Sequence, residues 1–150
     1  FTYYFLGMQV IFSLGEELGW RGYLLNKLKK KIPSFYFRAF FVGFVWGGWH
    51  IPYYIQLGLT PLQMGIFLLN VILISVVFTW LFEKRQSVLP TVVAHATHNI
   101  LFNAILPIIT LKQSAPDIFF GESGVLATIA YVLAILIFIV VGKQRNKQIV

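Results

Sequence analysis

The sequence contains no cysteine, which excludes disulfide bonds, thiolate metal ligands and a cysteine nucleophile. Charge is also scarce. Only 11% of the 150 residues are Asp, Glu, Lys or Arg, whereas a soluble domain carries about 25%. The basic residues that give the net charge of +7 flank apolar runs and form no continuous patch, so we expect no nucleic-acid partner. What the chain has in abundance is apolar side chains, at 58%, and this composition favours a membrane protein.

Five apolar runs divide the chain, and each is about as long as the 17–25 residues that cross a bilayer as a helix. They cover residues 1–25, 35–59, 62–82, 88–111 and 124–142. Stretches such as "VLATIAYVLAILIFIVV" show no alternation of apolar and polar residues, which favours helices over strands. The sequence therefore predicts an all-α fold, a multi-pass bundle of about five transmembrane helices.

The charges between the runs support this division, because basic residues accumulate in cytoplasmic loops. If successive loops alternate sides, eleven of the twelve Lys and Arg residues fall on one side. They are Arg21, Lys27, Lys29, Lys30, Lys31, Arg38, Lys84, Arg85, Lys143, Arg145 and Lys147. The loop with Lys112, Asp117 and Glu122 falls on the other side. We therefore expect a multi-pass integral membrane protein with a cytoplasmic C-terminus.

A few ionisable side chains lie deep inside the apolar runs, where a charge costs about 2.5–3.5 kcal/mol at the helix centre, so each is a candidate functional residue. They are Glu16, Glu17, Arg21, His50, His95 and His98. The depth of each residue in the membrane follows from its distance to the end of its run, at about 1.5 Å per residue. These depths predict that three different helices bring polar groups to the same depth, in the cytoplasmic half of the membrane. The alternative is that these groups are structural ion pairs or histidines bonded to backbone carbonyls.

In "SLGEELGWRG" the spacing of Glu17 and Arg21 is i, i+4, so the two side chains share a helix face and can form an ion pair. Glu16 points about 100° away and has no cationic partner nearby in the sequence. A buried carboxylate without a partner suits general-base chemistry, so we expect Glu16 to be the base and Glu17–Arg21 its support. The alternative is that Glu16, Glu17 and Arg21 only neutralise one another's charges and have no catalytic role.

The second polar position lies in "FVGFVWGGWHIPYY". Gly43 and Gly47 are four residues apart, a spacing that permits close approach of another helix. Pro52 removes a backbone hydrogen bond and is expected to kink the helix near His50, with Trp46 one turn earlier on the same face.

The third polar position lies in "LPTVVAHATHNILFN", where Pro90 fits the first turn of a helix. His95 and Asn99 are spaced i, i+4 and can project together as the donor pair that an oxyanion needs. His98 lies near the same face, and we expect it to pack or to support the other two.

These three stretches resemble the motifs of the CPBP family, which includes type II CAAX prenyl proteases and bacterial relatives. "EELGWR" resembles its EExxxR motif, and "HATHN" its His-xxx-Asn motif. "WGGWH" resembles its aromatic-xxx-His motif, with Trp46 where Phe is usual. The resemblance covers residues from about 10 to 105, in the family's order.

The resemblance implies an intramembrane endopeptidase that acts on a membrane-associated protein or peptide near the cytoplasmic face, and we expect its membrane to be a bacterial cell membrane. In the family the first-motif glutamate and second-motif histidine activate a water, which assigns these roles to Glu16 and His50. The third motif stabilises the oxyanion, which assigns that role to His95 and Asn99. We expect residues 1–150 to form a single integral-membrane protease domain that lacks its N-terminal helices.

Two questions remain open at this point. Family members are often called metalloproteases, and Glu16, His50 and His95 would supply the two-His, one-carboxylate set of a catalytic divalent metal such as zinc. No HExxH motif is present, and we favour a metal-free glutamate mechanism. The alternative functions are a non-catalytic membrane interaction or bacteriocin-immunity protein and, last, a proton or ion transporter.

Overall fold

The computed structural model describes residues 2–106 and 119–147, and within these ranges every regular element is a helix. The elements are α1 (Thr2–Glu17), the π-helix η1 (Leu18–Leu25), α2 (Asn26–Lys29), α3 (Phe35–Gln56), α4 (Pro61–Arg85), α5 (Leu89–Ile100), the π-helix η2 (Leu101–Ile105) and α7 (Val125–Lys147). The predicted all-α class is confirmed, and each predicted run contains a helix. The end of the fourth run, at residues 107–111, lies outside the described residues.

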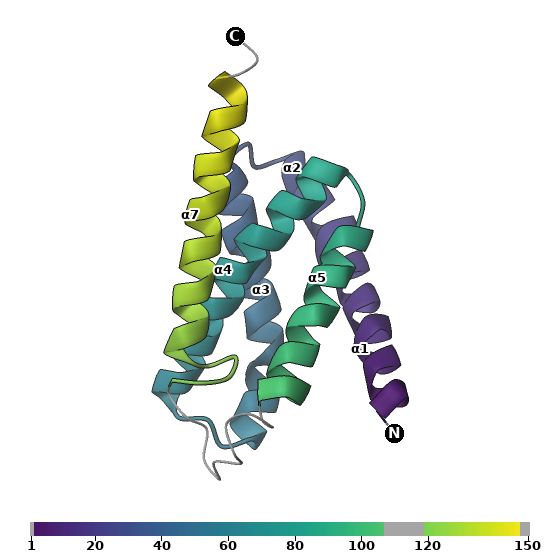
Figure 1. Cartoon of the computed structure of the whole chain (residues 1–150), viewed down its shortest axis with the longest axis vertical. Helices are drawn as coiled ribbons and strands as arrows, with labels where there is room; N and C mark the ends of the chain where they lie inside the picture. Colours follow the sequence, from purple (N-terminus) through teal and green to yellow (C-terminus); the bar gives the residue numbers. More distant parts are fainter. Residues whose placement is uncertain (1, 107–118, 148–150) are drawn as a thin grey trace.

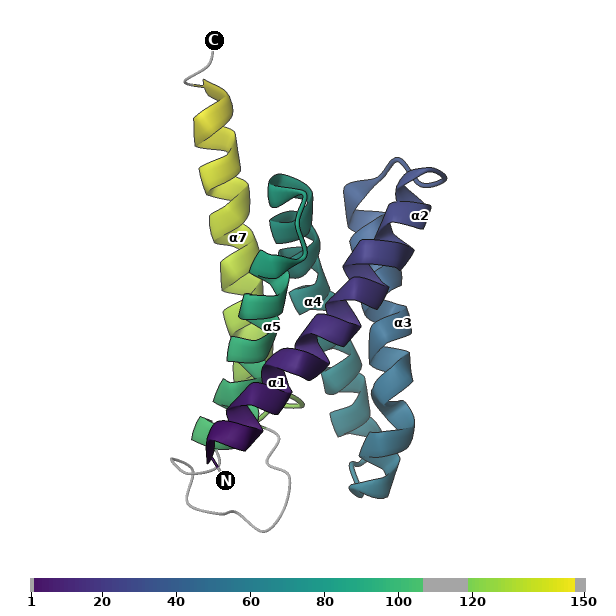
Figure 2. The ribbon, with the colours of Figure 1, turned by 90° about the vertical axis from the view of Figure 1, so that its right-hand side faces the viewer.

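Helix α4 lies at the centre of the bundle, and α3 packs against it along much of its length (Figure 1). Helix α7 lies against α4, and α1 crosses the bundle in contact with α5 (Figure 2). The larger apolar core joins α3 to α4 through Trp46, Phe67, Val71, Ile74 and Phe78. This arrangement places the three motif-bearing elements α1, α3 and α5 around a common interior.

The close approach of α3 and α4 depends on the two glycines that the sequence singled out. A Cβ atom added to Gly43 would lie 2.7 Å from the Cα atom of Ile72 and 2.8 Å from the Cβ atom of Ser75. One added to Gly47 would lie 2.6 Å from Cδ1 of Leu68. The predicted small-residue contact is thus present, and at Gly43 it involves backbone, which cannot move aside.

More polar side chains are buried, and more large apolar side chains are exposed, than is usual for a soluble domain. Several polar or charged side chains are buried in the interior: Ser13, Glu17, Arg21, Asn70, Ser75, Thr79, Thr91 and His95. Many large apolar side chains are exposed instead, among them Tyr4, Phe12, Trp49, Leu62, Val93 and Ile137. The apolar surface is larger than a soluble monomer normally exposes.

One of the described helices, Pro61–Arg85, is long and apolar enough to cross a membrane by length and composition. Basic residues of the predicted inside loops lie on α2 and at the C-terminal ends of α4 and α7, which share one end of the molecule (Figure 1). The turn between α3 and α4 and the start of α1 lie at the other end (Figure 2). Lys112 and Asp117, predicted for the opposite side, lie outside the described residues.

Candidate active site

The EExxxR motif lies where the first helix changes from α to π winding. Helix α1 ends at Glu17, and η1 then carries Arg21 on the same side. Nη1 of Arg21 donates to Oε1 of Glu17 over 2.9 Å, and both side chains are fully buried. Nη2 of Arg21 also donates to the Ser75 hydroxyl of α4 over 3.2 Å. The predicted ion pair is confirmed, and it also ties the first helix to the bundle centre.

Glu17 has a second partner that its sequence spacing did not indicate. Its Oε1 atom lies 2.9 Å from Nδ1 of His95, which comes from α5 and is itself buried. Because a carboxylate only accepts, the His95 Nδ1–H must donate, and the bond fixes the ring with Nε2 pointing away from Glu17. Glu17 therefore holds a residue of the third motif as well as the arginine of the first.

Glu16 is separate from this buried pair, as its position around the helix predicted. Its Oε2 atom accepts a 2.7 Å hydrogen bond from Nε1 of Trp46 and a longer one, 3.5 Å, from Nε1 of Trp20. Both donors are uncharged, so the carboxylate is held in place without an ion pair among the described residues. The tryptophan at the position where Phe is usual thus has a specific role here, because a phenylalanine could not make this bond.

His50 is half-buried on α3, one turn after Trp46. Its Nδ1 atom lies 3.0 Å from the backbone carbonyl oxygen of Trp46, which can only accept. The proton is therefore on Nδ1, and in the neutral ring Nε2 has an available lone pair. Helix α3 continues through Pro52 to Gln56.

His98 connects Asn99 to α7. Its Nδ1 atom lies 3.3 Å from Oδ1 of Asn99, and its Nε2 atom lies 2.5 Å from the Tyr131 hydroxyl. Since Oδ1 only accepts, the neutral His98 ring donates from Nδ1 and accepts the Tyr131 hydroxyl proton at Nε2. The amide of Asn99 then has Nδ2 as its donor for another group. The expected supporting position of His98 matches this geometry.

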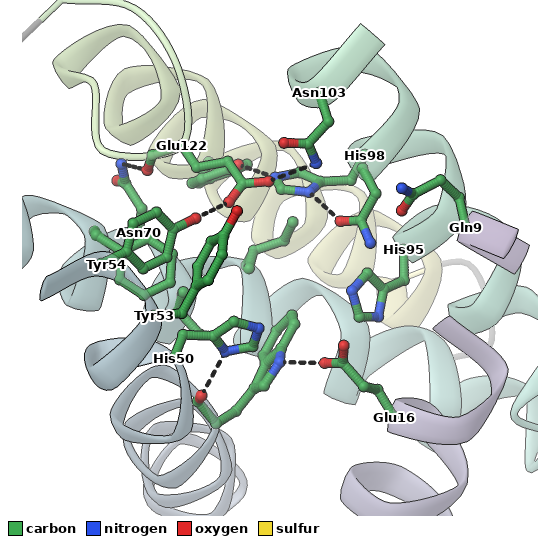
Figure 3. A pocket seen from close by; sticks show the side chains of 16 residues that line it. Gln9, Glu16, His50, Tyr53, Tyr54, Asn70, His95, His98, Asn103 and Glu122 are labelled. Atoms are coloured by element: carbon green, nitrogen blue, oxygen red, sulfur yellow. Dashed lines mark hydrogen bonds between the residues drawn. The ribbon is translucent and has the colours of Figure 1, made fainter. Parts of the chain in front are cut away.

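The four residues expected to carry the chemistry, Glu16, His50, His95 and Asn99, all line one cavity of about 360 Å³. Figure 3 shows the side chains of Glu16, His50 and His95 converging from three different helices. The expected supporting residues Trp46 and His98 also line this cavity, whereas the Glu17–Arg21 pair is buried behind it. The structure thus brings together polar groups that are up to 83 positions apart in the chain.

The cavity also contains residues that the sequence analysis did not select. Glu122, in the segment before α7, lines it together with Tyr54, Asn70, Asn103 and Tyr131. The Tyr54 hydroxyl donates to Oε2 of Glu122 over 2.5 Å. A glutamate in a loop between two apolar runs has no local signal that distinguishes it from a solvent-exposed charge.

A metal site is not supported by the side-chain arrangement. Within residues 2–106 and 119–147, no group of three or more His, Cys, Asp and Glu side chains is close enough to hold a metal ion. Of the expected ligands Glu16, His50 and His95, the glutamate is bonded to Trp46 instead. These residues do not fit a catalytic zinc centre, whose protein ligands bind at about 2.0–2.2 Å.

Comparison with known proteins gives two matches. Residues 1–101 match the family described as "Type II CAAX prenyl endopeptidase Rce1-like". Over 124 residues the chain is 27% identical to "CAAX prenyl protease 2" of Methanococcus maripaludis, an alignment that covers 77% of this chain and 43% of that relative. The chain thus spans less than half the length of the curated relative, and no solved structure matches it. Because this match covers residues 1–101, two thirds of the chain, the chain belongs to the Rce1-like type II CAAX prenyl endopeptidase family, as its three motifs predicted.

Proposed function

We propose that this chain forms the catalytic part of an intramembrane endopeptidase that hydrolyses a peptide bond of a membrane-associated protein or peptide. The observation that carries the proposal is the cavity into which α1, α3 and α5 bring Glu16, His50, His95 and Asn99. Membership of the Rce1-like family supports the reaction class. The exposed apolar side chains and the polar side chains buried among the helices support a multi-pass position in the bilayer.

In the proposed reaction a water molecule lies between the Glu16 carboxylate and Nε2 of His50. The Glu16 carboxylate can accept a proton from this water. Nε2 of His50 can also accept one, because the proton of the neutral ring is on Nδ1, which donates to the carbonyl oxygen of Trp46. The water oxygen attacks the carbonyl carbon of the substrate as its proton passes to Glu16. Glu16 then gives this proton to the leaving amide nitrogen, and the carbon–nitrogen bond breaks. No metal takes part in these steps.

The negative charge that develops on the substrate carbonyl oxygen requires hydrogen-bond donors in the cavity. Asn99 supplies Nδ2–H, since its Oδ1 atom is held by His98. His95 supplies Nε2–H when its ring carries both protons, with Nδ1–H on Glu17. Fixed donors of this kind stabilise an oxyanion without having to reorganise during the reaction.

Replacement of Glu16 by Gln tests the proposal directly, because it keeps the side-chain volume and removes the proton acceptor. We expect the full-length protein carrying Glu16→Gln to lose at least about a hundredfold in kcat on a membrane-associated reporter peptide. The matched control is Glu83→Gln, an equal change outside the cavity, which should remain active. Full activity of Glu16→Gln would contradict the proposed base, and loss of activity after chelation with recovery on adding zinc would contradict the metal-free mechanism.

A further inference from the structure

A second carboxylate lies in the cavity and takes no part in the proposed reaction. Oε2 of Glu122 accepts from the Tyr54 hydroxyl over 2.5 Å, and Oε1 lies 3.4 Å from Nδ2 of Asn103. The backbone carbonyl oxygen of Glu122 accepts from Nδ2 of Asn70 over 2.9 Å. The residue is thus held from α3, α4 and η2, and Figure 3 shows its side chain in the group with Tyr54 and Asn103.

Among the described residues, no lysine or arginine neutralises the charge of Glu122. Both groups that donate to its carboxylate, the hydroxyl of Tyr54 and the amide of Asn103, are uncharged. Among the described residues the ion pairs of carboxylates involve Glu17 and Glu83 only. In a site with little water an unneutralised carboxylate attracts a cation more strongly than it does in solution.

Of the described residues that line the cavity, none is a lysine or arginine that could repel such a cation. The lining contains two carboxylates, those of Glu16 and Glu122, and three histidines. The histidine that lies near Glu122 is His98, whose ring is neutral because Nδ1 donates to Asn99 and Nε2 accepts from the Tyr131 hydroxyl (Figure 3). The field in this part of the cavity therefore favours a positively charged group.

The walls near Glu122 also suit a cation. The aromatic rings of Tyr54 and Phe67 lie with their centroids 4.2 Å apart, and the ring of Tyr131 lines the same cavity. The faces of aromatic rings attract ammonium and guanidinium groups. The Tyr54 oxygen, which donates its proton to Glu122, keeps lone pairs that can accept from an ammonium group.

We propose that Glu122 and Tyr54 form a subsite that binds a lysine or arginine side chain of the peptide substrate, next to the water-activating Glu16. The proposal rests on the proposed peptidase function and names the substrate feature that the cavity selects. A cavity of about 360 Å³ has room for one such side chain beside the scissile bond but not for a folded segment. Glu122 is a specificity-determining residue here and moves no proton in the reaction.

The test compares reporter peptides that differ only by lysine or norleucine, placed in turn at each of several positions on either side of the scissile bond. We expect the unaltered protein to prefer lysine at one position by about tenfold or more in kcat/KM. In Glu122→Gln this ratio should fall to near one, whereas in Glu83→Gln it should persist. No preference at any position, or a preference that survives Glu122→Gln, would overturn the inference.

A binding measurement separates this inference from the peptidase function. The same peptides are titrated by fluorescence anisotropy against Glu16→Gln, with and without Glu122→Gln. We expect the lysine peptide to bind more tightly than the norleucine peptide only where Glu122 is intact. If the lysine peptide binds more tightly than the norleucine peptide but the unaltered protein cleaves neither, the subsite is supported and the peptidase function is contradicted. Should Glu122→Gln not fold, Glu122→Asp, which keeps the charge, and Glu122→Ala, which removes it, are used instead, and only Glu122→Asp should retain some lysine preference.

Discussion

At the scale of single residues, the two adjacent glutamates of the first motif have different surroundings and therefore different uses. Glu17 is fully buried and paired with Arg21, so removing Arg21 would leave a buried charge uncompensated, at a cost of about 3–5 kcal/mol. Glu16 is half-buried and bonded only to indole N–H groups, so its charge stays available to a substrate or water. One peptide bond separates a residue that stabilises the fold from one that we expect to react.

Trp46 provides a test of how Glu16 is positioned. Trp46→Phe removes the 2.7 Å hydrogen bond to Glu16 and keeps an aromatic ring beside His95 and Phe78. Since a hydrogen bond to a charged group is strong, we expect kcat on the reporter peptide to fall about tenfold. Trp20→Phe removes only the 3.5 Å bond and should have a smaller effect. Equal losses in the two variants, with equal thermal stability, would show that the Trp46 indole does not position the base.

At the scale of elements, the packing of α3 on α4 determines where His50 and Trp46 lie. Gly43 and Gly47 let the two helices approach until an added methyl group would collide with α4. The same contact brings Ser75 of α4 to the carbonyl oxygen of Ala39 at 2.9 Å and to Arg21 at 3.2 Å. The helix contact and the anchoring of the first motif are therefore linked through one serine.

Two glycines of α3 allow a matched comparison of this packing. In Gly43→Ala the new Cβ would lie 2.7 Å from backbone of α4, and we expect a loss of about 1–3 kcal/mol in stability. In Gly48→Ala the new atom meets nothing within 4 Å, and alanine favours helix by up to about 1 kcal/mol. Thermal unfolding in detergent should show a lower midpoint for Gly43→Ala and an equal or higher one for Gly48→Ala. The opposite order would contradict the close helix contact.

The sequence predicted the elements better than the contacts between them. Apolar runs locate helices directly, and the i, i+4 spacing was enough to predict the Glu17–Arg21 pair. The bond from Glu17 to His95 joins residues 78 positions apart and depends on how α1 crosses α5, which local spacing does not encode. The π winding of η1 escaped prediction, because α- and π-helices of this length share the same apolar composition. Glu122 was missed because tertiary packing alone turns its loop toward the cavity.

At the scale of the whole molecule, the ends of the bundle differ in charge. The basic residues on α2 and at the ends of α4 and α7 share one end, and Arg38 and Lys29 there contact Glu83. Since cytoplasmic loops attract basic residues, we infer that this end faces the cytoplasm. The cavity extends from Glu16 to residues near the opposite end, such as Tyr53, so the cytoplasmic position of cleavage stays a prediction.

The orientation can be measured by thiol labelling, because these 150 residues contain no cysteine. Lys30→Cys places a thiol at the basic end, and Gln56→Cys places one at the opposite end, both at exposed positions. With a membrane-impermeant reagent we expect intact cells to label Gln56→Cys, and Lys30→Cys only after permeabilisation. The reverse pattern would invert the topology, and labelling of both in intact cells would argue against a membrane-spanning bundle.

The π winding of η1 has a consequence for insertions and deletions. Its backbone hydrogen bonds span five residues where those of an α-helix span four, so each turn contains more residues. Deletion of one residue in this segment, such as the exposed Gly19, can therefore be compensated by a return to α winding, which leaves the residues after η1 near their present orientation. Arg21 would then follow Glu17 by three positions instead of four, a spacing that also shares a helix face. We expect η1 to tolerate the loss of one residue better than the α-helical turns of α1, where the same deletion rotates every later residue by about 100° around the axis.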